Sequence, residues 1–132
     1  HHHKGGKSFP YFIRREDNER LFIGGLSTSW VNKETGEIFD TVSFVTTKAN
    51  SFMAQIHNNP KAKEPRMPLI LDDIESVNWL RGSPGEVIKL IKPNQSQKLK
   101  ASTVSRLRGK EYIGNKKEIQ DMFEYEELKG QI

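Results

Sequence analysis

The sequence predicts a mixed α+β fold, in which short helices interrupt a mostly antiparallel, twisted sheet or open barrel. Three observations indicate this class. Apolar runs rich in β-branched and aromatic residues recur at short intervals. The turns between the first runs are too short for parallel crossovers. Later segments carry helix caps and apolar residues at helical spacing. An all-β fold would leave those later segments unexplained.

The first half of the chain is predicted to form strands. Two apolar runs, 10–15 and 20–30, flank a Glu-Asp-Asn-Glu turn, and we expect them to pair as an antiparallel hairpin. Gly24 and Gly25 inside the second run indicate a bulge or a close approach of two backbones. A polar turn with a central glycine then leads to a third strand over 41–49.

Helices and one further strand are predicted next. An asparagine-capped helix of two turns covers 50–57, and the prolines within 58–65 end it and predict an exposed loop. A nearly all-apolar strand follows at 66–71. Two helices, 72–80 and 83–92, begin with acidic residues that suit the helix dipole.

We predict less regular secondary structure for the end of the chain. A polar linker leads into a basic extended segment over 94–108, and the tail after it has apolar residues at helix-like spacing. The 132 residues suffice for one compact domain, 1–132. No stretch approaches the roughly 20 apolar residues of a membrane span, so we expect a soluble protein without a membrane partner.

Charge and cysteine content narrow the possible functions. The net charge of +4 is compatible with a nucleic-acid partner without proving one. The chain has no cysteine, which excludes disulfides, zinc–thiolate sites and a thiol nucleophile within these residues. No glycine-rich phosphate loop and no serine nucleophile elbow occurs. We therefore expect no metal and no cofactor.

His57 is the single histidine outside the run at the start of the chain. At the end of a helix, a protonated histidine is stabilised by the carbonyl end of the helix dipole and needs no other role. A histidine also titrates near neutrality, so it can act as a general acid or base. Both interpretations stay open at the level of the residues.

Basic residues follow the histidine. Arg66 could be a surface cation or could grip a backbone phosphate with its planar fork. Lys61 and Lys63 in the loop could extend a positive surface, although such clusters are commonly solvated. His1–His3 could be a purification tag, a metal-binding tract or native residues.

The order of the segments resembles the SRAP domain, the SOS-response-associated peptidase family, whose members crosslink to abasic sites in single-stranded DNA. The resemblance runs in order from residue 9 to residue 115, through PYFI, LFIGGLSTSW, VSFVTTKAN, an Ile-His pair, RMPLIL and a Trp-Leu pair. The Ile-His and Arg-Met-Pro pieces are its most specific part. The family usually has one residue between this His and Arg, whereas eight intervene here, 58–65.

The resemblance implies roles for individual residues. His57 matches the catalytic histidine, Thr46 an active-site threonine that forms hydrogen bonds, and Arg66 an arginine that contacts the DNA backbone. The insertion 58–65 puts Lys61 and Lys63 beside the expected DNA channel. The family's nucleophile is a Cys exposed after removal of the initiator Met, and an Asn and a Glu complete its site.

These three residues have no counterpart in the chain. We therefore expect residues 1–132 to be the C-terminal part of an SRAP domain, inactive without its N-terminal half, and His1–His3 to be native residues that follow the Glu.

The resemblance implies a DNA-damage-response protein that binds single-stranded DNA. Its N-terminal Cys would form a thiazolidine with an abasic site and would also act as an autopeptidase, a combined hydrolase and lyase function. We expect a bacterial, cytoplasmic and nucleoid-associated monomer. One alternative is a non-enzymatic, basic single-stranded-DNA-binding module. Another is a structural or protein-interaction domain in which His57 only caps a helix.

Overall fold

The computed structural model describes residues 1–94 and 98–130. The chain divides into two compact units. Unit 1 comprises His1–Arg20, Ser51–Pro65 and Lys98–Ile132. Unit 2 comprises Leu21–Asn50 and Arg66–Gln97. The predicted α+β class is confirmed, since short helices accompany strands that pair antiparallel throughout the described residues. The single domain 1–132 stays a prediction.

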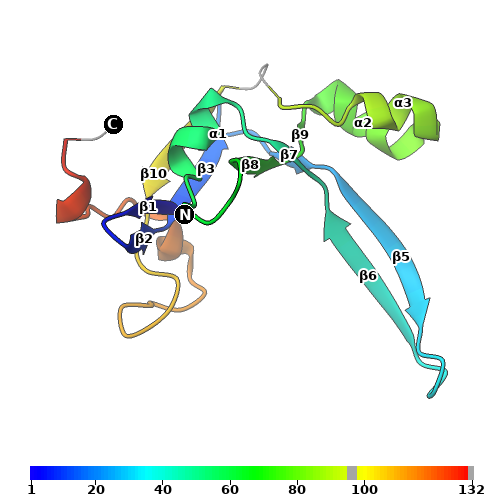
Figure 1. Cartoon of the computed structure of the whole chain (residues 1–132), viewed down its shortest axis with the longest axis horizontal. Coiled ribbons are helices and arrows are strands. Elements are labelled where there is room, and N and C mark those ends of the chain that lie inside the picture. Colours follow the sequence, from blue (N-terminus) through cyan, green and yellow to red (C-terminus); the bar gives the residue numbers. More distant parts are fainter. Residues whose placement is uncertain (95–97, 131–132) are drawn as a thin grey trace. The chain divides into compact units, whose positions relative to one another are not determined.

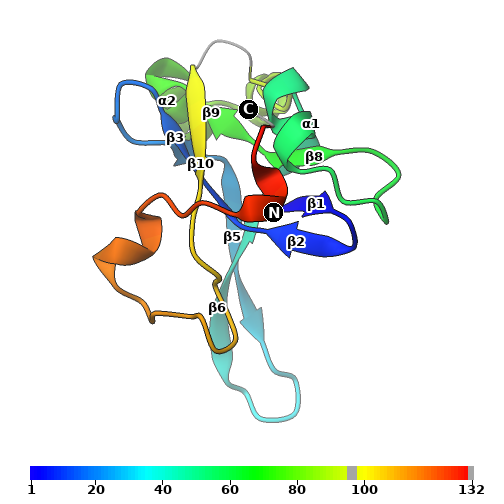
Figure 2. The ribbon, with the colours of Figure 1, turned by 90° about the vertical axis from the view of Figure 1, so that its left-hand side faces the viewer.

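Unit 1 contains two antiparallel strand pairs (Figure 2). Strand β1 (His2–Lys4) pairs with β2 (Lys7–Phe9). Strand β3 (Tyr11–Arg15) pairs with β10 (Leu99–Thr103), so that Tyr11 lies opposite Thr103. The predicted hairpin between 10–15 and 20–30 is therefore wrong. An apolar run indicates a strand but does not choose its partner, and here the partner lies more than eighty residues away.

The tail of the chain builds the core of unit 1. It forms two short 3₁₀ helices, η1 (Lys117–Gln120) and η2 (Glu126–Leu128), where helix-like spacing was noted. Phe9, Tyr125 and Leu128 form the buried cluster, with Tyr11 packed against it. The Tyr125 hydroxyl donates to the Val104 carbonyl at 2.8 Å, and burial raises the pKa of this phenol.

Unit 2 contains three short strand pairs (Figure 1). Their bounds are β4 (Phe22–Ile23) with β9 (Ile70–Leu71), β5 (Gly25–Val31) with β6 (Ile38–Phe44), and β7 (Thr46–Lys48) with β8 (Arg66–Pro68). The predicted strands at 41–49 and 66–71 both exist, but each is divided by one residue. Those residues are Val45 and Leu69.

Three backbone hydrogen bonds join the points where the strands of unit 2 are divided. Val45 donates to the carbonyl of Gly24 at 2.9 Å, Leu69 donates to Val45 at 2.8 Å, and Gly24 donates to Leu69 at 2.9 Å. A Cβ atom on Gly24 would lie 2.8 Å from Cδ2 of Leu69, which is fully buried. The close backbone approach expected at Gly24 is therefore confirmed.

Two helices complete unit 2. Helix α2 (Asp73–Arg81) begins with a capping box, in which Glu75 N–H donates to the Asp72 carboxylate at 2.7 Å and Asp72 N–H donates to Glu75 at 3.1 Å. Helix α3 (Pro84–Lys89) begins with proline. Both helices were predicted, with slightly different ends. Within the described residues, no helix is long and apolar enough to cross a membrane.

Gly24→Ala should destabilise the protein. The added methyl group would overlap the Leu69 side chain, which has no solvent-filled space to move into. Overpacking of this kind costs about 1–3 kcal/mol. Urea denaturation should show this loss, whereas Gly85→Ala, where a Cβ meets nothing within 4 Å, is the matched control. Equal midpoints for Gly24→Ala and the unsubstituted protein would contradict the close-approach interpretation.

Candidate nucleic-acid interface

Thr46 and Arg66 lie together in unit 2. Strands β7 and β8 place Lys48 opposite Arg66, and the arginine side chain reaches back along β7 to Thr46. Its Nε donates to Thr46 Oγ1 at 3.2 Å, and one terminal nitrogen donates to Thr46 Oγ1 at 3.1 Å and to the Thr46 carbonyl at 2.8 Å. Two residues that were predicted separately therefore form one hydrogen-bonded pair.

The alternation of side chains along β7 explains why Thr46 is accessible. Thr46 and Arg66 are exposed, whereas Thr47, which points to the opposite face, is 7% exposed. Bonds to threonine restrain the guanidinium, a group that can bind a phosphate through two parallel hydrogen bonds. The pair thus presents a positioned cation on the exposed side of β7 and β8.

His57 lies in unit 1, immediately after helix α1 (Ser51–Ile56). Its backbone N–H donates to the Met53 carbonyl at 2.7 Å, which continues the helical hydrogen-bonding pattern by one residue. Met53 and Ile56 are the buried residues of α1, while His57 is exposed. This position suits both a helix-terminal cation and a proton-transfer group.

The loop after His57 is attached to strand β1. The Asn58 side chain accepts from the His3 N–H at 2.6 Å and donates to the His3 carbonyl at 2.9 Å. These two bonds take the place of the backbone hydrogen bonds that a neighbouring strand would form with His3. Lys61 and Lys63 are both exposed on this loop. Sequence reasoning missed Asn58, and an asparagine between a helix and a proline was the only signal that could have found it.

The histidine run belongs to the folded unit. His2 and His3 are residues of β1, and His2 Nδ1 lies 3.0 Å from the Gln55 carbonyl. The His2 ring also packs edge-on against Tyr11, with centroids 6.0 Å apart. The expectation that these histidines are native residues stays a prediction.

Arg106 has a structural position in unit 1. Its guanidinium lies 5.2 Å from the ring centroid of Phe9 and 5.1 Å from that of Tyr125, and it donates to the Ser8 carbonyl. Its Nε also lies 3.8 Å from the Glu111 carboxylate, so the two rings, the carbonyl and this carboxylate account for the charge at the edge of the core of unit 1.

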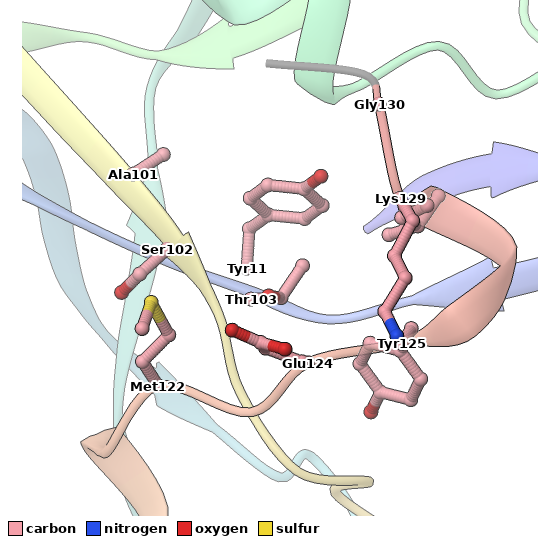
Figure 3. A pocket seen from close by; sticks show the side chains of 10 residues that line it. Tyr11, Ala101, Ser102, Thr103, Met122, Glu124, Tyr125, Lys129 and Gly130 are labelled. Atoms are coloured by element: carbon pink, nitrogen blue, oxygen red, sulfur yellow. The ribbon is translucent and has the colours of Figure 1, made fainter.

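A hollow of about 320 Å³ lies between β3, β10 and the tail (Figure 3). The Tyr11 ring and the side chains of Thr103 and Glu124 surround it, with Lys129 on the side of the tail. None of the predicted site residues is among the described residues that line it. The predicted site residues therefore lie outside this hollow.

The family of the chain is established by comparison with known proteins. The profile of the SOS response associated peptidase (SRAP) family matches residues 1–110. The chain belongs to the SRAP family. The match leaves the tail after residue 110 outside.

Relatives support the same assignment. The abasic site processing protein YoqW of Bacillus subtilis is 29% identical over 101 residues, which are 74% of this chain and 42% of that protein. The protein of the same name from Bacillus phage SPbeta has the same identity and coverage.

Two solved structures have a fold similar to that of this chain. A protein from Bacteroides thetaiotaomicron has a TM-score of 0.76 and 30% identity, over 92% of this chain and 51% of that one. A protein from Bordetella bronchiseptica has a TM-score of 0.65 and 29% identity, over 75% and 46% of the two chains. This SRAP chain thus spans about half the length of the relatives that it matches.

Asn58→Ala should loosen the loop without unfolding the protein. Both bonds to His3 would be lost, and local opening of 58–65 would become more frequent. Limited trypsin digestion should then cleave faster after Lys61 and Lys63. Gln55→Ala is the control, because only the backbone carbonyl of this exposed residue bonds to His2. Identical cleavage rates for the two variants would show that Asn58 does not hold the loop.

Proposed function

We propose that this SRAP chain takes part in the covalent capture of abasic sites in single-stranded DNA. Three observations support this: the family match over residues 1–110, the name of the YoqW relatives, and the Thr46–Arg66 pair exposed on β7 and β8. The last observation carries the most weight, because a guanidinium restrained by threonine suits a phosphate in the strand that holds the damage.

The chemistry requires a reactive amine and thiol from outside these residues, because the chain contains no cysteine. The amine of an N-terminal Cys attacks the ring-opened aldehyde of the abasic sugar, and loss of water gives an imine. The thiol then adds to the imine carbon, its proton passes to the nitrogen, and a thiazolidine closes. The same Cys would serve the autopeptidase reaction of the family.

His57 is proposed as the proton-transfer group of this reaction. Ring opening of the sugar, imine formation and reversal each move a proton, and an imidazole can accept or donate it near neutral pH. The exposed position after α1 leaves the side chain accessible to a substrate. A glutamate from the part of the family domain not spanned here would act as its partner.

Thr46 and Arg66 are proposed to position the strand. Arg66 binds a backbone phosphate, and Thr46 forms hydrogen bonds near the reacting sugar while it restrains the arginine. Lys61 and Lys63 add charge along the DNA channel. Phosphate contacts of this kind make the affinity depend strongly on salt.

The remaining half of the SRAP domain is proposed as the protein partner. The chain spans 42% of YoqW and 51% of the Bacteroides protein. In unit 2, the β5–β6 hairpin leaves apolar side chains on both faces accessible; Leu26 is 61% exposed and Phe44 is 70% exposed. A two-stranded hairpin is only marginally stable by itself. A covering segment would stabilise it, and the same segment would supply the Cys, Asn and Glu.

A non-enzymatic single-stranded-DNA-binding module remains the second candidate. The net charge of +4 and the exposed Trp30 on β5, which could stack on a base, favour it. It differs from the first proposal in one outcome, since it gives no covalent product with abasic DNA.

His57→Ala should slow crosslinking about 100-fold, the lower end of what a general acid–base group contributes. The complete reading frame would be mixed with single-stranded DNA that carries one abasic site and run on a denaturing gel. Gln55→Ala is the control on the same helix. A covalent band that is unaffected by His57→Ala would leave His57 as a helix-terminal cation only.

A comparison of Arg66→Gln with Arg66→Lys should separate two contributions of Arg66 to DNA binding, its positive charge and the planar shape of its guanidinium. Loss of one phosphate contact should lower the slope of log affinity against log salt by about 0.7 in Arg66→Gln. Arg66→Lys keeps the charge and hence the slope, but it should bind more weakly, because an ammonium cannot form the planar, paired contact. Fluorescence anisotropy with labelled single-stranded DNA measures both. Unchanged binding in both variants would remove Arg66 from the interface.

A further inference from the structure

A second hollow of unit 1 lies between the β1–β2 hairpin and the loop that follows α1. Its volume is about 790 Å³. Figure 2 shows the hairpin and the loop on the same side of the unit. Its lining residues are His3, Lys4, Gly5, Gly6, Ser8, Asn58, Asn59, Pro60 and Lys61. The family resemblance assigns a role to Lys61 alone among these residues.

The two walls of this hollow are held at a fixed spacing. The paired bonds between Asn58 and the His3 backbone join the loop to β1 at 2.6 and 2.9 Å. Beyond this point, the Asn59 side chain accepts from the Lys61 N–H at 3.0 Å and turns the loop back over the hairpin. The shape of the hollow is therefore built into the backbone contacts.

The electrostatic character of the hollow is positive. Lys4 and Lys61 line opposite walls, and no acidic side chain is among the described residues that line it. The Lys4 ammonium donates to the Glu127 carbonyl at 2.6 Å, which uses one of its three N–H groups. Lys7 is different, because its ion pair with Glu127 at 2.8 Å already neutralises it. The two lining lysines thus supply the charge.

The tip of the hairpin leaves the entrance open. Gly5 and Gly6 have φ of +56° and +75°, the combination that a two-residue turn of type I′ requires. No atom lies within 4 Å of a Cβ placed on either residue. A ligand can therefore approach the backbone at the tip, where two side chains would otherwise project.

We propose that this hollow, between Lys4 on the hairpin and Lys61 on the loop, binds phosphate groups of the DNA strand that flanks the damaged nucleotide. The inference rests on the proposed function, and it adds a second anchoring point for the strand, in unit 1. A phosphodiester chain fits an open, cationic hollow with small residues in its walls. The first half of the segment 58–65 then forms one wall of the site, through Asn58, Asn59, Pro60 and Lys61.

Lys4→Gln, Lys61→Gln and the double variant test the site. Anisotropy would be measured with undamaged oligothymidylates of increasing length over a range of salt concentrations. Each single variant should lower the salt slope by about 0.7 and the affinity about fivefold, with additive slopes in the double variant. Lys116→Gln, an exposed residue of unit 1 away from the hollow, should change neither quantity.

The outcomes separate this site from the proposed function. An unchanged salt slope in the double variant overturns the inference, even if abasic DNA still forms a covalent band. A lowered slope without any covalent band upholds the inference and removes only the capture chemistry. Inorganic phosphate should compete poorly, because a strand contacts both lysines at once. Competition by phosphate that equals competition by unlabelled oligothymidylate would assign the hollow to the free anion instead.

Discussion

The ring of backbone hydrogen bonds between Gly24, Val45 and Leu69 organises the second unit. Each of these residues stands alone between two consecutive strands, and each bonds to both of the others. At this point three segments of the chain each end one strand and begin the next. In each segment the next strand pairs with a different strand from the one before. The absence of a side chain at Gly24 makes the ring possible, because Leu69 occupies the space that a Cβ would need.

The candidate interface depends on this ring. Thr46 follows Val45 directly, and β8 leads into Leu69, so the ring sets the register in which β7 and β8 pair. A slip by one residue would turn Thr46 inward and bring Thr47 to the surface. The observed register leaves the Thr46 hydroxyl and the Arg66 guanidinium on the same exposed face. The local geometry thus brings together two residues that the sequence predicted for the site.

The segment 58–65 is attached to the first unit. Eight residues between a helix and a strand could have formed an unattached surface loop. The Asn58 side chain instead bonds to the backbone of β1. The loop that carries Lys61 and Lys63 therefore starts beside the β1–β2 hairpin. Arg106 lies against the rings of Phe9 and Tyr125 and pairs with Glu111, so its charge is largely satisfied within the first unit.

The sequence alone determined the α+β class, the helices at α1, α2 and α3, the glycine at a close approach, and the family. These features depend on neighbouring residues or on ordered motifs, such as the Asp72–Glu75 capping box and the Arg-Met-Pro block. Tertiary structure alone decided that β3 pairs with β10, that Val45 and Leu69 divide their strands, and that Arg66 bonds to Thr46. Such choices arise from contacts between distant segments, which the alternation of apolar residues along one strand does not encode.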